Sequence, residues 1–289
     1  MKNIFKSIFA LSAAALVVSC NVDNIGVKYS PDTVGSGVSF VQKVVSNNEI
    51  PASTASYDIA VARSNADGAA TVNINSSLPE GMCPASVSFA AGQYETNVTL
   101  NLTEMPVGVP VKGTIALVDQ PEFANSAINV TLAKAYSWTS IGQGEFLEYF
   151  WEGFVGKVEI LKADGFEVYR VLDPYAAAEE ADTKGPEYIQ FEVVDTARGI
   201  VHFDTWTSPY DYDGAKHYVK AYRPSEGSSK YADYDDYSVI VDNYYVALLP
   251  YMYIDGVGGW NVSAGYCFGI SFPGAPMSIW DWFDEQGLL

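Results

Sequence analysis

The feature that most constrains the fold is a period-two alternation of apolar and polar residues. Along residues 94–102, apolar side chains largely occupy alternate positions, with polar side chains between them. Successive side chains of a β-strand point to opposite faces of a sheet, so this pattern predicts a strand with one buried face. The apolar positions are Tyr94, Val98, Leu100 and Leu102.

About seven such segments fall within residues 35–134, with no helical periodicity among them. Turn signals separate the segments, for example Asn65–Gly68 and Pro79–Gly81. Short strands at this spacing are typical of a β-sandwich. The expected strands are 38–45, 57–62, 70–74, 87–89, 94–102, 111–117 and 128–132.

The composition changes near Ala135. All six Trp and 17 of the 20 Tyr lie from Tyr136 onward, where 32 of 154 residues are aromatic. We therefore expect a second, aromatic-rich antiparallel β-domain over residues 136–289, which makes the whole chain all-β. Short helical turns are expected at Glu145–Trp151 and Ala176–Ala181. The expected strands are 154–161, 168–171, 189–194, 200–206, 217–222, 238–249 and 262–272.

The N-terminus has the layout of an export signal. Two lysines precede an apolar run, Ile8–Val18, which is too short to span roughly 30 Å of hydrocarbon. The stretch Leu16–Cys20 resembles a bacterial lipobox. This resemblance implies cleavage after residue 19, lipidation of Cys20 and a membrane-anchored tether over residues 20–34. Asn21 stands where an aspartate would retain a lipoprotein in the inner membrane, so the resemblance implies sorting to the outer membrane, with the body on the cell surface. The alternative is an ordinary secretory signal.

The net charge restricts the partners. It is −19 for the chain and becomes −21 once a signal containing Lys2 and Lys6 is removed. A field of this sign argues against nucleic acid and anionic lipid surfaces, and it is compatible with neutral glycans, cations or basic partners. Solubility alone is the simpler explanation. Cys83 and Cys267 have no CxxC or Cys/His spacing, so a zinc site is not expected. They lie far apart in the sequence, in different expected domains, so a disulfide between them is not expected either.

Two motifs of the first domain resemble the Calx-β family. One is Val61-x-Arg63 at the end of a strand, and the other is Val87-x-Phe89-x-x-Gly92-Gln93 at a turn. The resemblance covers residues 35–134 and implies an immunoglobulin-like sandwich. Calcium-binding members use clustered carboxylates, but the comparable places here hold Val44–Ser46 and Leu102–Glu104. Calcium binding is therefore not expected in this domain.

The second domain resembles one that follows Calx-β-like modules in surface lipoproteins of Gram-negative bacteria. The residues that carry this resemblance are Trp138–Gly144 and Tyr169–Tyr175. It implies location and architecture only.

Catalytic signatures are weak. His202 and Asp204 alternate on one strand face, as a base and its orienting carboxylate would, but no G-x-S-x-G elbow accompanies them. A polar pair on a solvent-facing surface is the favoured interpretation. Paired carboxylates for glycoside hydrolysis stay open, because their separation in space decides that question. The sequence favours a binding protein over an enzyme.

Two acidic loops are candidate calcium sites. Alternating carboxylates before a glycine turn supply some of the oxygens that calcium needs. The closing glutamate of an EF-hand is missing, because Tyr222 stands at its offset. Solvated acidic turns are the favoured alternative. The candidate calcium ligands are Asp211, Asp213, Asp233, Asp235 and Asp236.

Aromatic residues in or beside these loops are the candidate ligand-binding residues. Trp and Tyr offer flat apolar faces with polar tips, on which sugar rings and protein partners pack. Most aromatic residues of a small β-domain fill its core, and the terminal segment Ile279–Phe283 either packs back or offers an apolar surface. The candidates are Trp206, Tyr210, Tyr212, Tyr234 and Tyr237.

The resulting hypothesis is a non-catalytic surface lipoprotein whose second domain binds a glycan, with the sandwich as a spacer. This arrangement resembles glycan-capturing lipoproteins of outer-membrane uptake systems. The alternatives are a structural or adhesive envelope protein that binds another protein, and a glycan hydrolase. Two or three coplanar exposed aromatics would favour the first, a flat apolar patch the second, and a cleft with two carboxylates the third.

Overall fold

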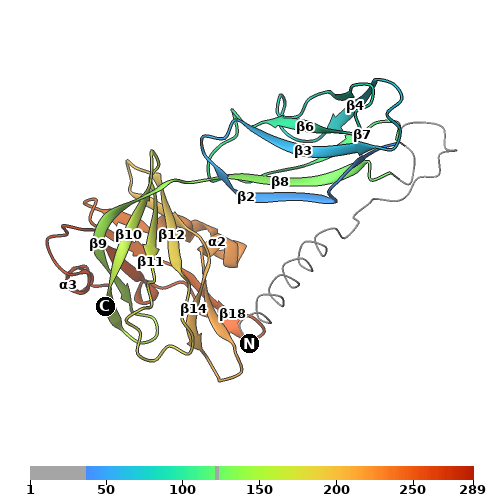
Figure 1. The fold of residues 1–289 in the computed structure, drawn as a ribbon. Coiled ribbons are helices and arrows are strands. Elements are labelled where there is room, and N and C mark those ends of the chain that lie inside the picture. Colours follow the sequence, from blue (N-terminus) through green and yellow to red (C-terminus); the bar gives the residue numbers. More distant parts are fainter. Residues whose placement is uncertain (1–36, 121–123) are drawn as a thin grey trace, which may run out of the picture. The chain divides into compact units, whose positions relative to one another are not determined.

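The computed structural model describes residues 37–120 and 124–289 (Figure 1). The predicted signal over residues 1–19, the predicted lipidation site Cys20 and the predicted tether over residues 20–34 lie outside these residues. The chain divides into two compact units between Ala135 and Tyr136. Strands are the main regular structure of both units, with 48% of residues in strands and 9% in helices, so the all-β prediction is confirmed. No helix in the described part is long and apolar enough to cross a membrane.

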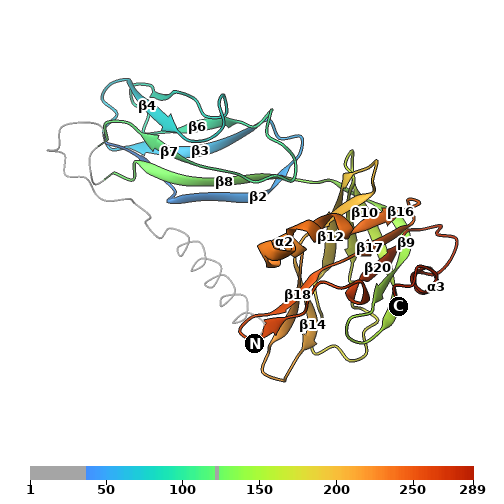
Figure 2. The same cartoon turned by 180° about the vertical axis from the view of Figure 1, so that it is seen from behind.

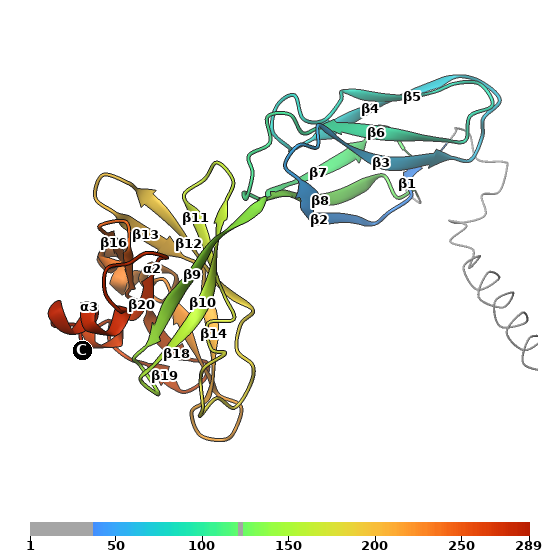
Figure 3. The same cartoon turned by 60° about the vertical axis from the view of Figure 1, so that its left-hand side comes forward.

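The N-terminal unit is a sandwich of two sheets around one core (Figure 3). All strand pairs are antiparallel except β2 and β8, which run parallel. One sheet has the order β1 (Val38–Phe40), β3 (Ser56–Arg63), β6 (Glu95–Asn101). The other has the order β2 (Val44–Pro51), β8 (Ala127–Ala135), β7 (Val111–Leu117), β4 (Ala70–Ser76), β5 (Ser86–Phe89).

The alternation read from the sequence is the alternation of burial. In β6, Val98 and Leu100 are fully buried, whereas Asn97 before them and Thr99 between them are exposed. Tyr94 departs from the expected pattern: it precedes β6, and 58% of it is exposed. Burying one face of each strand against the other sheet removes apolar surface from water, which is the main stabilising contribution of a sandwich.

Contacts of Arg63 explain why the Val61-x-Arg63 motif and the turn motif over residues 87–93 occur together. Its side chain is buried, its Nε donates to the carbonyl of Gln93 and its Nη2 donates to that of Ala90, each at 2.7 Å. The guanidinium also lies 5.0 Å from the ring centroid of Phe89. Gly92 allows the turn, since its φ is +80°. The strand-end arginine and the turn therefore hold each other in place.

The C-terminal unit contains a closed eight-stranded antiparallel barrel (Figure 2). Pairing of β9 with β20 closes it, with Phe146 opposite Ile270. The barrel interior is filled by side chains, among them Phe146, Phe191 and Phe268. In order around the barrel the strands are β9 (Trp138–Glu148), β10 (Phe154–Ala163), β11 (Val168–Leu172), β12 (Tyr188–Asp195), β13 (Ile200–Phe203), β16 (Val239–Val241), β17 (Tyr245–Leu248) and β20 (Phe268–Ser271).

Two excursions from the barrel build a second sheet, which we call the outer sheet. It has the order β14 (Trp206–Asp211), β15 (Tyr218–Tyr222), β18 (Tyr251–Ile254), β19 (Gly258–Gly259). Its inner face extends the barrel core, because Trp206 lies 5.2 Å from Phe268 between ring centroids. Short helices lie on the connections back to the barrel: α2 (Pro224–Gly227) and η1 (Ser229–Tyr237) between β15 and β16, and η2 (Ala264–Tyr266) between β19 and β20.

Two expected helical turns are absent. Glu145–Trp151 is wrong as a helix, because residues 145–148 complete β9, where Phe146 enters the core. The carboxylate of Glu148 then accepts the N–H groups of Trp151 and Glu152, both at 2.8 Å, and shapes a turn. Burial raises the pKa of Glu148 although these hydrogen bonds lower it. Ala176–Ala181 is also wrong as a helix and forms irregular turns.

The C-terminal segment packs back onto the barrel as helix α3 (Ile279–Glu285) (Figure 2). The hydroxyl of Ser278 caps its first turn by accepting the N–H of Asp281. Trp282 stacks on Tyr245 with centroids 4.9 Å apart, and Phe283 is fully buried. Of the two alternatives for this segment, packing back is therefore the one realised.

Candidate functional site

Two of the predicted ligand-binding aromatics are core residues. Trp206 and Tyr210 are 4% and 1% exposed, since both lie on the inner face of β14. The indole N–H of Trp206 donates to the hydroxyl of Tyr175 at 3.0 Å, and the hydroxyl of Tyr210 donates to Glu152 at 2.8 Å. Tyr210, with its face packed and its hydroxyl group bonded, offers no ligand-binding surface, so the expectation is wrong for this residue. Trp206 is also mostly buried, but it lines the cleft described below.

The other three predicted aromatics are exposed but do not form one site. Tyr212, Tyr234 and Tyr237 are 48%, 38% and 62% exposed. Tyr212 contacts Trp151 and Trp260, whereas Tyr234 and Tyr237 contact each other. These three tyrosines are close to the acidic loops in the sequence, but they do not form one common surface.

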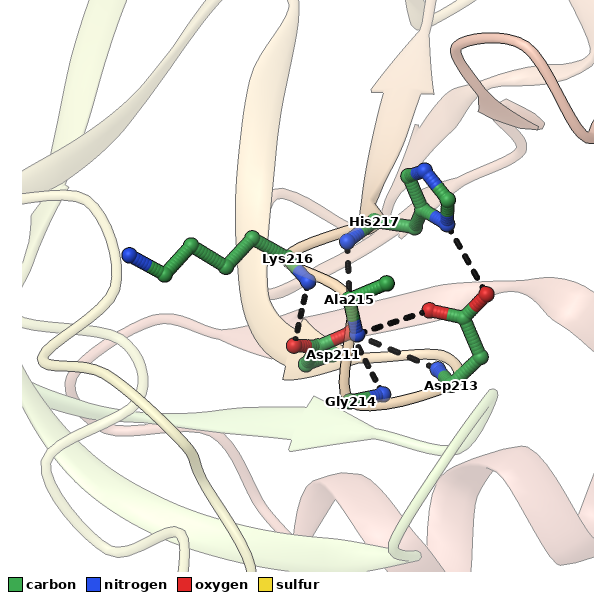
Figure 4. A network of polar contacts seen from close by, with 6 residues as sticks. All are labelled: Asp211, Asp213, Gly214, Ala215, Lys216 and His217. Atoms are coloured by element: carbon green, nitrogen blue, oxygen red, sulfur yellow. Dashed lines mark hydrogen bonds and ion pairs between the residues drawn. The ribbon is translucent and has the colours of Figure 1, made fainter.

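The first acidic loop is a hydrogen-bonded turn between β14 and β15 (Figure 4). The carboxylate of Asp211 accepts the N–H groups of Lys216 at 2.7 Å and Gly214 at 3.0 Å, and that of Asp213 meets Nδ1 of His217 at 2.9 Å. Slight desolvation raises the pKa of Asp211, but its backbone hydrogen bonds outweigh this and hold the pKa low. The His217 hydrogen bond lowers the pKa of Asp213. These carboxylates stabilise the turn.

The second acidic loop lies on η1, where two of its three carboxylates are engaged. Asp235 accepts both the N–H and the hydroxyl of Ser225, and Asp236 pairs with Arg198 at 3.1 Å. Asp233 is exposed. Within residues 37–120 and 124–289, no group of three or more His, Cys, Asp or Glu side chains is arranged to hold a metal ion.

The proposed His202–Asp204 pair is not formed among the described contacts. Nδ1 of His202 lies 3.3 Å from Nη1 of Arg223, and its Nε2 is buried with no hydrogen-bond partner in the described residues. Asp204 instead accepts a hydrogen bond from the side-chain amide of Gln190 at 2.9 Å. A histidine base oriented by Asp204 is therefore not present.

A cleft of about 600 Å³ lies between the segment that leads into β12 and strand β14. We call it the cleft throughout. Aromatic and hydrogen-bonding side chains share its walls, and it opens to solvent beside Tyr188, which is 39% exposed. The lining residues are Thr183, Gly185, Pro186, Glu187, Tyr188, Ile189, Gln190, Asp204, Thr205, Trp206, Thr207, Ser208 and Tyr218.

A chain of three polar side chains runs along the outer barrel face into the cleft. Nε of Arg170 donates to Oε1 of Gln190 at 2.8 Å, and Nε2 of Gln190 donates to Oδ2 of Asp204 at 2.9 Å. The three residues come from β11, β12 and the end of β13, where alternate side chains face outward. Because each member fixes the next, the donor and acceptor groups of this wall are held in place before any ligand arrives.

The surroundings of Asp204 disfavour the ionised form of its carboxyl group. Partial burial raises its pKa first, and the negative charge of Glu226 raises it further, while Arg170 and Arg223 lower it. The net direction is upward. The group nonetheless lies at the exposed edge of the cleft, where a ligand can reach it.

Arg170 is held between two aromatic rings. Its guanidinium carbon lies 4.2 Å from the ring centroid of Trp138 and 3.9 Å from that of Tyr188. A cation over the face of an aromatic ring is attracted by the ring quadrupole, and two rings fix its plane. Tyr188 thus belongs both to this stack and to the wall of the cleft.

Sequence reasoning missed most of this site. Asp204 was considered only as the partner of His202, and Arg170, Tyr188 and Gln190 were not candidates. One signal was available: Tyr188 and Gln190 alternate with the buried Ile189, which places both on the outward face of β12. The pairing of β11 with β12, which brings Arg170 opposite Gln190, is a tertiary fact.

A second aromatic feature is a row of six tyrosines on the outer face of the outer sheet and on η1, which we call the tyrosine row. Consecutive ring centroids lie 5.0–6.5 Å apart, and the ring planes are inclined by 30–76°. The rings therefore contact one another in a continuous series without a coplanar platform, and Tyr231 within the series is buried. In order they are Tyr222, Tyr253, Tyr251, Tyr231, Tyr234 and Tyr237.

The known proteins to which the chain is similar do not indicate what this site binds. No family model and no curated protein matches the chain. Among solved structures it is similar to calcium binding domain CBD12 of CALX1.1, at 12% identity and a TM-score of 0.27, over 47% of this chain and 77% of that one. CBD12 from CALX1.2 is similar at 10% identity and a TM-score of 0.29, over 47% and 79% of the two chains. This weak similarity to calcium-binding domains covers less than half of the chain and shows no function.

Proposed function

We propose that the chain is a non-catalytic binding protein whose C-terminal unit captures a saccharide in the cleft. One observation carries the proposal: Tyr188, which is 39% exposed and has one ring face covered by Arg170, lines a cleft of about 600 Å³ together with the prearranged pair of Gln190 and Asp204. A sugar ring has an apolar face for the tyrosine and a rim of hydroxyl groups for the amide and the carboxylate. Outer-membrane anchoring through Cys20, with the sandwich as a spacer, is part of the proposal.

Free hydrogen-bonding capacity in the cleft supports a polar ligand. Oδ1 of Asp204 has no hydrogen bond among the described contacts, and Gln190 uses one of its two amide hydrogens on Asp204. Hydroxyl groups of a saccharide both donate and accept, so they match this mixture of groups.

Replacing Tyr188 with alanine is the first test. Loss of the ring removes the apolar wall and one half of the Arg170 stack, so saccharide affinity is expected to fall on the order of tenfold or more. The ligand is first identified by screening the purified full chain on a glycan array, and affinities are then measured by calorimetry.

Tyr94→Ala is the matched control, because Tyr94 is 58% exposed and belongs to the N-terminal unit. It should leave the affinity unchanged. Equal losses in both variants, or no glycan bound by the wild-type chain, would contradict the proposal.

The pH dependence of binding should follow Asp204. Its carboxylate accepts hydroxyl groups only when ionised, and burial raises its pKa, so protonation begins at a higher pH than for an ordinary aspartate. Affinity should therefore be full at neutral pH and fall as the pH decreases through this raised pKa. Asp204→Asn should bind more weakly at neutral pH and lose this dependence. A wild-type affinity that stays constant as acidification protonates the carboxyl groups of the folded protein would exclude this role.

Two other functions each have one observation in their favour. For a hydrolase, Glu187 and Asp204 both line the cleft, and release of reducing ends from a bound oligosaccharide would favour catalysis. For an adhesive protein, the tyrosine row offers a strip suited to a protein partner. Partner binding that depends on Tyr237, with no glycan bound, would favour adhesion.

A further inference from the structure

We infer that Arg170 makes the cleft selective for acidic saccharides, with the guanidinium binding a sugar carboxylate. This inference rests on the proposed saccharide binding and names its ligand class. It starts from a comparison of the four arginines of the chain: Arg63, Arg170, Arg198 and Arg223.

Three of these arginines direct an Nη group at a protein acceptor. Nη2 of Arg63 donates to a backbone carbonyl, Nη1 of Arg198 to Asp236, and Nη2 of Arg223 to Glu226 at 2.8 Å. Arg170 differs, because its only described hydrogen bond uses Nε. No carboxylate of the described residues lies within ion-pair distance of it.

The two Nη groups of Arg170 are held in a fixed position. Trp138 and Tyr188 cover the two faces of the guanidinium, and Gln190 takes its Nε, so the two Nη groups remain as a pair of parallel donors. Such a fork matches the two oxygens of a carboxylate, and the pairing is charge-assisted. Holding the side chain in advance reduces the entropy that binding would cost.

Arg170 is not itself a lining residue of the cleft, but it is hydrogen-bonded to the lining residue Gln190 and stacks on the lining residue Tyr188, so the row of polar groups has two different ends. Gln190 stands between Arg170, which only donates, and Asp204, which only accepts when ionised. A uronic acid residue carries a carboxylate at one carbon and hydroxyl donors at others, so it can satisfy both ends at once. A neutral sugar would leave the positive charge of Arg170 unpaired. Because the chain as a whole is negative, selection of an anion must come from this local group.

The test compares oligomers of galacturonic, glucuronic and mannuronic acid with the same oligomers after reduction of their carboxyl groups. The full chain should bind at least one acidic oligomer on the order of tenfold more tightly than its reduced form. Arg170→Gln should abolish this preference, so the ratio of the affinities for the acidic and the reduced oligomer should fall to about one. The ratio is the readout, because Arg170 also holds Gln190 and Tyr188 and its loss can weaken the binding of both oligomers. Arg170→Lys, which keeps the charge and loses the fork, should retain only part of the preference.

Arg198→Gln is the matched control, because it removes the same charge from a surface pair with Asp236 and should keep the preference. Equal binding of the acidic and reduced oligomers would overturn the inference and leave saccharide binding intact. Binding of neither form would overturn both. A preference that survives in Arg170→Gln would show that another group reads the carboxylate.

Discussion

Replacing Gly144 with alanine is expected to lower the free energy of unfolding of the C-terminal unit by about 3 kcal/mol or more. A Cβ atom at this position would lie 2.0 Å from the carbonyl oxygen of Ser271 and 2.7 Å from Cδ1 of Ile160. The first of these atoms belongs to the backbone of β20, so a side-chain rotation cannot relieve the overlap. Either β9 or β20 must move, and their pairing is the contact that closes the barrel.

Denaturant unfolding followed by tryptophan fluorescence checks this, because all six Trp lie in the C-terminal unit. Gly265→Ala is the control, since an added Cβ there has no neighbour closer than 4.0 Å. It should change the stability by less than about 1 kcal/mol. A Gly144→Ala variant as stable as the control would mean that the barrel does not close through this contact.

Truncating Phe283 to alanine should cost about 3–5 kcal/mol. The ring is fully buried under α3 and packs against Gly269 of β20, where an added Cβ would meet it at 2.6 Å. Removing it leaves a cavity between the helix and the barrel wall, because Leu147 and Tyr245 are held by the strands and cannot fill the space.

Trp280→Ala on the same helix provides the comparison. Trp280 is 39% exposed, and its one described aromatic contact is an edge-to-face contact with Tyr149 at 5.9 Å between centroids. Its loss should cost about 1 kcal/mol or less. If both variants lost equal stability, or neither did, α3 would not be an integral part of the barrel core.

The sandwich could be predicted because its strands follow the simplest rule. One face of each strand is buried, so burial alternates, and the strands at 57–62 and 111–117 appear near their predicted positions. The strands of the barrel were harder to predict from the sequence. Segment 238–249 was expected as one strand, but Asp242 and Asn243, both with φ near +55°, turn it into the hairpin of β16 and β17. Two consecutive residues with positive φ are typical of a tight hairpin turn.

The site was harder to predict than the fold because exposure depends on tertiary packing. Tyr210 and Tyr212 are only two positions apart, yet one is 1% and the other 48% exposed. The difference arises because Tyr210 lies within β14 and packs against the barrel core, whereas Tyr212 follows the end of the strand, in the turn. Likewise the carboxylates of the Asp211 turn are occupied by nearby N–H groups, which a loop sequence does not reveal.

The central claim is that a saccharide binds in the cleft, with its ring against Tyr188. The most direct measurement is a crystal structure of the chain with the tightest-binding oligosaccharide. We predict a sugar ring packed on Tyr188, with hydroxyl groups within hydrogen-bond distance of Gln190 and Asp204. A sugar bound elsewhere, along the tyrosine row for example, with the cleft empty, would contradict the claim.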